Sequence, residues 1–339
     1  MNTGHTIFNE TVPTYTVLGG TERLASTGLS VILLNRGGRY PRKTYIDELK
    51  KQGFDYIVSV ESQGANYEIE QLADAYPFVR FILLKEMLSV GEMINIAALE
   101  IKEPLFFVLW NDFHLLQGLN AARIAEKLLL KTNYLAKGDQ NKKRYIRLCT
   151  VPVIQNSNFE TLPLSLIPKI KRKRLEIFPF AAGKEGDATL YPYDAVGIYD
   201  KERFLEIGGF DTEIKKPYWQ IMDFGMRAWL WGEQIRTTQL VRLRVDGEIQ
   251  AGDSTADDSY RRFFLKNLAV SVKKGIQKNG QIESCASIPW TYFLQFMLKT
   301  GIGFFAAKKE FSQARLWIKS KEKRFTCSPS SIEKLFASV

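Results

Sequence analysis

Short apolar runs alternate with segments of helical periodicity through the first third of the chain. The apolar runs have the length of strands, and they cover residues 29–34, 55–61, 79–84 and 104–110. The segments between them predict helices over residues 43–52, 68–76 and 89–101. This alternation predicts a doubly wound α/β sheet with right-handed crossovers, in which ligands bind at the carboxyl ends of the strands.

The alternation continues in the middle of the chain with longer elements. A helix is expected over residues 119–132 and a strand over residues 144–154. A further strand ends at Tyr199, and Asp200 follows it in the position of a helix cap. The sheet is therefore expected to gain strands beyond the first alternating unit.

A glycine pair separates the capped helix from a second one. Gly208 and Gly209 permit left-handed backbone where a side chain would clash. The helix that follows is expected over residues 219–233, where Asp223 and Arg227 form an i, i+4 pair. The alternative to a functional role is that this pair lies on the surface and that the tryptophans of the segment belong to the core.

Beyond residue 259 the chain is rich in basic and aromatic residues. Three segments predict helices, over residues 260–275, 290–307 and 311–325. The second is strongly apolar but is interrupted by Gln295 and Lys299, which favours a buried or membrane-surface helix over a membrane span. These helices either fold over the preceding domain or lie on an anionic membrane, and the sequence leaves both readings open.

The composition shifts define three regions. Residues 1–27 are a polar leader without the basic start and apolar run of a signal peptide. An α/β domain is expected over residues 28–250, with halves at 28–118 and 119–250. Residues 251–339 form the basic and aromatic C-terminal region.

Charge and cysteine content narrow the classes of partner. The chain has 339 residues, a formal net charge of +10 and a pI near 9.3, which favours anionic partners. The basic run at residues 171–174 lacks interleaved aromatic residues, so nucleic-acid binding is not expected. Cys149, Cys285 and Cys327 are widely spaced and show no zinc or disulfide pattern, which fits a cytoplasmic protein.

Asp112 and His114 stand two residues apart at the end of an apolar strand. Carboxylate oxygen and imidazole nitrogen together suit Mn²⁺ or Mg²⁺ bridging a diphosphate. In the alternative interpretation, Asp112 caps the next element and His114 is an ordinary surface or core residue. Spacing alone leaves both open.

The order of these elements resembles a family 2 glycosyltransferase of the GT-A fold. The most specific match is "AVGIYDKERFLEIGGFD…DFGMRAWLWG", which is similar to the family's strand, helix, GGFD, E-D-x-D, arginine and glycine. "LSVILLNRGGR", "VSVESQG", "SVGEMINIAA" and "LWNDFH" resemble its preceding elements in the same order. The resemblance spans residues 29–250 and implies a mixed sheet flanked by helices, with a Rossmann-like nucleotide-binding half and a helical C-terminal extension.

The resemblance implies a nucleotide-sugar site at the ends of the first strands. Glu61 takes the place of an aspartate that contacts the base or ribose, and Asp112 takes that of the metal-ligand acid of the DxD motif. The implied nucleotide-sugar-binding residues are Asn35, Arg36, Glu61, Asn95 and Asp112.

The resemblance also implies an acceptor face and a catalytic base. Gly209, Trp219 and Arg227 fall on the acceptor segment, where an aromatic ring can stack on a sugar. Asp223 is the candidate base that removes the proton of an acceptor hydroxyl, with Asp211 of "GGFD" as the second candidate.

Three positions depart from the family pattern. The first acid of DxD falls on Trp110, whereas Gln220 and Ile221 stand where E-D-x-D has its glutamate and catalytic aspartate. The family often completes its metal shell with a histidine after the acceptor segment, a place that Asp246 or Asp253 would take here. The implied ligands of Mn²⁺ or Mg²⁺ are Asp112, His114 and Asp246.

The function implied is transfer of a sugar, with inversion, from a nucleotide-diphosphate sugar to a glycan or lipid-linked acceptor. The protein is then expected in the cytoplasm, with a possible peripheral position on an anionic membrane surface. The alternative is a catalytically impaired nucleotide- or sugar-binding protein that keeps the fold. A nucleotidyltransferase is less favoured, because "VLGGTERL" is a poor phosphate-binding loop.

Overall fold

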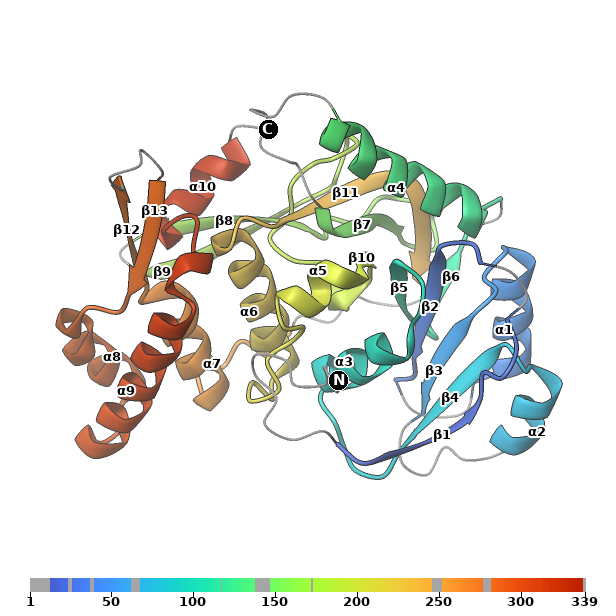
Figure 1. The fold of residues 1–339 in the computed structure, drawn as a ribbon, viewed down its shortest axis with the longest axis horizontal. Coiled ribbons are helices and arrows are strands. Elements are labelled where there is room, and N and C mark those ends of the chain that lie inside the picture. The colour runs from blue at the N-terminus through green and yellow to red at the C-terminus, as the bar shows by residue number, and fades with distance from the viewer. Residues whose placement is uncertain are drawn as a thin grey trace.

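A mixed β-sheet forms the centre of the protein in the computed structural model (Figure 1). The structure describes residues 13–23, 26–36, 40–61, 68–116, 118–137, 147–171, 173–245, 252–276 and 282–337. Its nine strands in this described part are β1 (Tyr15–Gly19), β2 (Leu29–Leu34), β3 (Ile57–Glu61), β4 (Val79–Leu84), β5 (Leu105–Trp110), β6 (Phe113–Leu115), β7 (Arg147–Gln155), β10 (Gly197–Asp200) and β11 (Gln234–Val245).

Helices flank this sheet, and two short hairpins stand beside it. The α-helices are α1 (Arg42–Lys51), α2 (Ile69–Ala75), α3 (Val90–Glu100), α4 (Ala121–Lys137), α5 (Lys201–Glu206), α6 (Pro217–Leu230), α7 (Asp258–Phe263), α8 (Phe293–Thr300), α9 (Phe304–Ser320) and α10 (Pro329–Ala337). The hairpins are β8 (Ser165–Lys171) with β9 (Arg174–Phe180), and β12 (Ser271–Ile276) with β13 (Ile282–Ser287). Single-turn segments are η1 (Tyr193–Ala195), the π-helix η2 (Phe264–Leu268), η3 (Trp290–Tyr292) and η4 (Glu322–Arg324).

The strand directions create one edge where several chain segments meet. The order is β1-β4-β3-β2-β5-β10-β7-β11-β6, with β2, β3, β4 and β5 parallel and β10 antiparallel to β5. The carboxyl ends of β2, β3 and β5 therefore lie at the same edge as the start of β10. Ligands of open α/β sheets bind at such an edge.

The continuous apolar runs explain why the central strands lie inside. All residues of β2, β3 and β5 are buried, as expected for parallel strands covered on both faces. The expectation of a mixed α/β sheet flanked by helices is confirmed.

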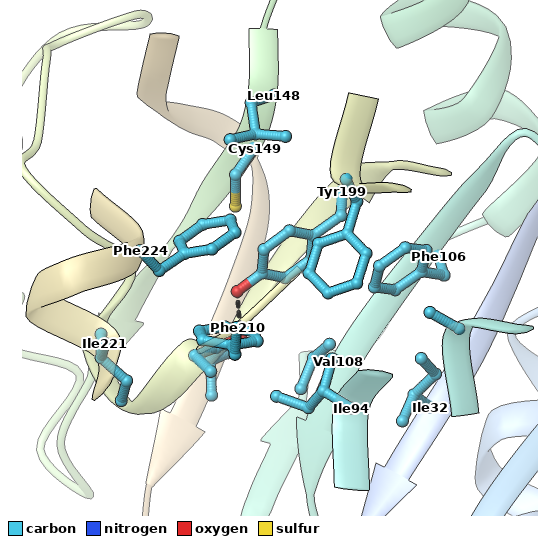
Figure 2. Packing of buried hydrophobic residues seen from close by; sticks show 14 of the residues in the cluster. Ile32, Ile94, Phe106, Val108, Leu148, Cys149, Tyr199, Phe210, Ile221 and Phe224 are labelled. Atoms are coloured by element: carbon cyan, nitrogen blue, oxygen red, sulfur yellow. Dashed lines mark hydrogen bonds between the residues drawn. The ribbon is translucent and has the colours of Figure 1, made fainter. Parts of the chain in front are cut away.

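Aromatic side chains join the middle of the sheet to α6. The rings of Phe106 and Tyr199 stack at 5.1 Å between centroids, and those of Phe210 and Phe224 stack at 4.5 Å (Figure 2). The Tyr199 hydroxyl donates a hydrogen bond to the carbonyl of Ala195 at 2.7 Å, which satisfies the one polar atom that the ring buries. This cluster fixes the "GGFD" segment and α6 against β10.

The C-terminal region is less regular than expected. The segment 260–275 changes from α7 to the π-helix η2 and then to strand β12, and 290–307 breaks at Gly301, whose φ of 65° ends α8. Of the basic residues 171–174, Lys171 ends β8, Arg174 begins β9, and Lys173 between them has a φ of 61°. Within the described residues, no helix combines the length and apolar content that crossing a membrane requires.

The absence of a side chain at Gly225 lets α6 approach the segment before β10 closely. A Cβ atom at this position would lie 2.3 Å from the carbonyl oxygen of Leu190 and 2.8 Å from the Cβ of Tyr191. Because backbone would have to move, Gly225→Ala is expected to lower the free energy of unfolding by about 1–3 kcal/mol in urea denaturation. Gly183→Ala is the matched control, since a Cβ there meets no atom within 4 Å. Equal stability of the two variants would contradict the close packing.

Candidate functional site

An arginine lies between two carboxylates at the carboxyl edge of the sheet. Arg36 follows β2, Asp112 follows β5, and Asp194 lies in η1 just before β10. The Arg36 Nε donates to Asp112 Oδ2 at 2.6 Å, and an Nη of the same guanidinium donates to the Asp194 carboxylate. The sheet topology thus brings together residues that are far apart in the sequence.

Trp110 forms one wall of this cluster. The Arg36 guanidinium carbon lies 4.3 Å from the centre of the Trp110 ring, and the indole Nε1 donates to the Asp194 carbonyl at 3.0 Å. The Arg36 and Asp112 side chains are 39% and 37% exposed, whereas Trp110 is buried. The cluster therefore presents a planar cation and a carboxylate to a ligand, and the Trp110 ring supports them from inside the protein.

Two asparagines hold the loop after β2. Asn111 donates from its Nδ2 to Asn35 Oδ1 at 3.1 Å, and its own Oδ1 accepts from the Arg36 backbone at 3.3 Å. These bonds tie the ends of β2 and β5 and fix the direction in which Arg36 leaves the sheet. Asn35 and Arg36 lie at the edge where they were expected, but contact with a nucleotide stays a prediction.

Asp194 is a residue of this cluster that the sequence interpretation missed. Burial raises the pKa of its carboxyl, Arg36 opposes that rise, and the charge of Asp112 adds to it. Its φ of 53° lies in the left-handed region, which Asp tolerates better than most residues. The only signal in the sequence is an aspartate in "YPYDAVG", and nothing there indicates its partner.

The predicted metal ligands do not assemble into a shell in the described residues. His114 lies in β6, opposite Arg244 of β11, and Asp246 is outside the described residues. One oxygen of Asp112 is buried and makes no hydrogen bond to a described residue, but the other bonds Arg36. No group of three His, Cys, Asp or Glu side chains in the described ranges is placed to hold a metal ion. Arg36 thus occupies one oxygen of Asp112, and binding of Mn²⁺ or Mg²⁺ by Asp112 and His114 stays a prediction.

Glu61 lies at the end of β3, at the same edge but inside the protein. Its side chain is 0% exposed, and its Oε2 accepts from Arg42 at 2.8 Å while its Oε1 accepts from Ser59 at 2.7 Å. Burial, together with the charge of Glu61, raises the pKa of Tyr40. Arg42 thus neutralises the buried acid, a partner that the sequence interpretation missed, and contact of Glu61 with a base or ribose stays a prediction.

The "GGFD" segment is pinned by side chains from α3 and α6. Asn95 donates to the Phe210 carbonyl and accepts from the Phe210 backbone N–H, both at 2.9 Å. Arg227 donates to the carbonyls of Ile207 at 2.6 Å and Gly209 at 2.7 Å. Gly209 has a φ of 62°, and a Cβ there would lie 2.3 Å from Asn95 Oδ1. The glycine and the two polar side chains form one structural unit.

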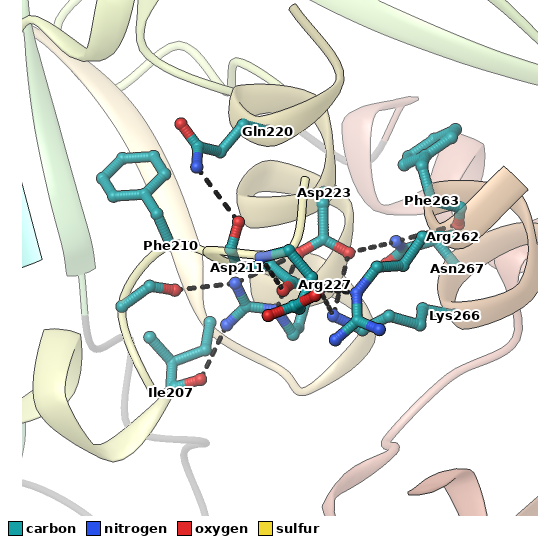
Figure 3. A network of polar contacts seen from close by, with 12 residues as sticks. Ile207, Phe210, Asp211, Gln220, Asp223, Arg227, Arg262, Phe263, Lys266 and Asn267 are labelled. Atoms are coloured by element: carbon teal, nitrogen blue, oxygen red, sulfur yellow. Dashed lines mark hydrogen bonds and ion pairs between the residues drawn. The ribbon is translucent and has the colours of Figure 1, made fainter. Parts of the chain in front are cut away.

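Asp211 and Asp223 belong to a buried ionic cluster (Figure 3). Asp211 accepts from Arg262 at 2.7 Å and forms an ion pair with Lys266, while Asp223 accepts from Asn267 at 2.7 Å. Burial would raise the pKa of Asp211, but Lys266 and Arg262 outweigh it and lower the pKa to about 2. Asp211 is therefore charged, and cations lie against both carboxylates.

The segment that the resemblance assigns to the acceptor is buried. Asp223 and Arg227 are 0% and 1% exposed, so the pair does not lie on the surface. Trp219 is buried and donates from Nε1 to the Thr255 carbonyl at 3.0 Å. The three tryptophans of the segment belong to the core, as the alternative interpretation held. The catalytic roles of Asp211 and Asp223, and acceptor contacts of Gly209, Trp219 and Arg227, stay predictions.

Comparison with known proteins shows the class of fold. No protein-family model matches the chain, and no curated protein does. The crystal structure of GalNAc-T7 with UDP, GalNAc and Mn²⁺ is similar at 12% identity, with a TM-score of 0.50 over 70% of this chain and 47% of that one. TarS residues 1–349 from S. aureus with UDP-GlcNAc align at 11% identity and a TM-score of 0.46, over 87% and 73% of the two chains.

The likeness to GalNAc-T7 establishes the architecture. The chain spans about half the length of that structure. It has the mixed α/β fold of GT-A-type glycosyltransferases. Activity, donor and acceptor do not follow from the fold.

Asp211→Asn tests the buried ionic cluster. The substitution keeps the shape but leaves Lys266 and Arg262 without the carboxylate that both contact. We expect a loss of about 3–5 kcal/mol in the free energy of unfolding, measured by urea denaturation at neutral pH. Asp258→Asn is the control, because that side chain is 89% exposed. A loss no larger than that of the control would show that the cluster contributes nothing to stability.

Comparing wild type with Asp211→Asn at different pH values tests the lowered pKa of Asp211. A carboxyl with a pKa of about 2 when folded and ~3.9 when unfolded stabilises the protein above the unfolded value. This contribution is lost as pH falls through that window. The stability gap between wild type and Asp211→Asn is expected to narrow from about pH 4 to about pH 2, and a constant gap would refute the assignment.

Arg36→Met tests whether the arginine keeps divalent ions out. Removing the guanidinium leaves the carboxylates of Asp112 and Asp194 without the cation that they share. Mn²⁺ titration without nucleotide, followed by electron paramagnetic resonance, is expected to show at least about tenfold tighter binding in the variant. Arg203→Met is the control, because it likewise removes the cation from a carboxylate, that of Glu233, outside the cluster. Equal Mn²⁺ binding by wild type and Arg36→Met would show that the arginine does not exclude the ion.

Proposed function

We propose that the protein is a family 2-like glycosyltransferase that moves a sugar from a nucleoside-diphosphate sugar to a glycan or lipid-linked acceptor. The cluster of Arg36, Asp112, Asp194 and Trp110 at the carboxyl edge of the sheet carries this proposal. It lies where α/β folds bind ligands, and it presents the guanidinium of Arg36 and the carboxylate of Asp112 for polar contacts with a sugar nucleotide. The GT-A type of fold supports the same class of reaction.

The proposed reaction is a displacement with inversion at the anomeric carbon. An acceptor oxygen forms the new bond from the face opposite the leaving nucleoside diphosphate, while a base takes its proton. The diphosphate would compete with Asp112 and Asp194 for the guanidinium of Arg36, whose fork geometry suits phosphate oxygens. A divalent ion bound with the nucleotide would add positive charge beside the leaving diphosphate.

The second candidate is a nucleotide- or sugar-binding protein without turnover. Ile221 stands where the resemblance places the catalytic aspartate, and its buried side chain cannot accept a proton. Asp223, two residues further along α6, is enclosed in the ionic cluster. Asp223 would act as a base only if the cluster opened toward the acceptor. The enclosure of Asp223 therefore favours the second candidate.

Thermal shifts with UDP, GDP, dTDP, CDP and ADP, each with and without Mn²⁺, test the nucleotide site. A ligand that binds only the folded protein raises the melting temperature with its concentration. We expect one nucleotide to produce a shift that Asp112→Asn and Arg36→Met reduce. Asp258→Asn, whose side chain is 89% exposed, is expected to behave as wild type. No shift with any nucleotide would overturn the proposal.

The two candidates differ in turnover. With the sugar form of the selected nucleotide, a transferase releases nucleoside diphosphate, at a rate that acceptor increases. A protein that binds without turnover shows the thermal shift but no release. Dependence of the shift on Mn²⁺ would show that an ion enters with the nucleotide.

A further inference from the structure

A strip of large apolar side chains is exposed at the end of the molecule formed by α8 and α9. In Figure 1 these helices project from the opposite end of the protein to α1 and α2. The exposed fractions are Trp290 51%, Leu294 59%, Leu298 72%, Phe304 52% and Phe305 85%. Residues 290, 294 and 298 are four apart, so η3 and α8 present them on one face. Contiguous exposed apolar side chains of this kind mark an interaction surface.

The strip is preformed because its rings pack on one another. Trp290 lies 5.8 Å from Phe293 and 5.2 Å from the buried Phe311, between ring centroids. Phe293 meets Phe304 edge-on at 5.6 Å, and Phe304 meets Phe305 at 5.7 Å. Folding alone has therefore fixed these side chains while leaving their outer faces in water.

Basic residues of α9 border the strip. Lys308 and Lys309 are exposed one turn after Phe304 and Phe305. The guanidinium carbon of Arg315 lies 4.7 Å from the centre of the Trp290 ring. A cavity of about 520 Å³ opens beside that ring, and its lining includes Arg315, Leu316, Lys319 and the acid Glu322. Cations thus border the apolar side chains over two turns of α9 and at the cavity.

We propose that this surface docks on an anionic lipid bilayer. The leucines and aromatic rings would enter the interface between head groups and acyl chains, and Lys308, Lys309 and Arg315 would contact lipid phosphates. Trp290 is half exposed, and tryptophan is enriched at membrane interfaces. Lysines are depleted at protein–protein interfaces, so the charge pattern favours lipid over a protein partner. The proposal does not depend on the nucleotide site.

Co-sedimentation with vesicles tests the docking surface. The full chain is mixed with vesicles of phosphatidylcholine alone, or of phosphatidylcholine with about one-third phosphatidylglycerol. Wild type is expected to sediment with the anionic vesicles only, and less as salt rises, because basic residues supply the charge selectivity. The triple variant Leu294→Ser, Leu298→Ser, Phe305→Ser is expected to bind at least about tenfold more weakly.

Two further variants keep the test specific. Met87→Ser removes an apolar side chain that is 93% exposed and far from α8 in the sequence, and it is expected to bind vesicles as wild type does. Lys308→Glu with Lys309→Glu is expected to abolish the preference for anionic vesicles. Unchanged melting temperatures and nucleotide shifts would show that the variants remain folded and that the site of the proposed transferase is intact.

Three results would overturn the proposal. Wild type could fail to bind anionic vesicles, or the triple variant could bind them as tightly as Met87→Ser. Sedimentation velocity could instead show a wild-type dimer that the triple variant dissociates without any vesicle binding. That third result would assign the strip to a contact between two copies of the chain.

Discussion

The buried charges around α6 are the constraint on which the rest of the structure depends. Asp211 and Asp223 have no contact with water, and two carboxylates in such a place are tolerated only beside cations. Arg227 comes from α6 itself, whereas Lys266 comes from the π-helix after α7. The "GGFD" segment, α6 and the C-terminal region must therefore meet before these charges are neutralised.

The residues that most resemble a glycosyltransferase motif make hydrogen bonds that hold the fold together. Asn95 and Arg227 satisfy backbone groups around Gly209, and Gln220 bonds the backbone of Gly91 and Asp211. The groups open to a ligand lie elsewhere, where the strand ends of the first half meet the segment before β10. In this chain the side chains of the motif thus build the fold, and the groups available for chemistry lie apart from it.

The sequence predicted the elements whose patterns are local. Continuous apolar runs such as residues 29–34 are typical of buried strands, and Asp200 caps α5 by accepting from the Arg203 backbone, as its position indicated. Pairings between distant segments carry no such signal, which is why Asp194 beside Arg36 was missed. In the C-terminal region, the helix expected over residues 260–275 is wrong from residue 271 onward, because cross-strand pairing with β13 decides the conformation there.

The position of Lys266 in the chain also sets an order of events during synthesis. It follows Asp211 by 55 residues, so the "GGFD" segment leaves the ribosome well before its principal counter-ion. Translation proceeds at roughly 5–20 residues per second, which leaves this loop for some seconds with a carboxylate that cannot yet be buried. The "GGFD" segment of the nascent chain therefore stays hydrated until α7 and η2 leave the ribosome and can pack against it.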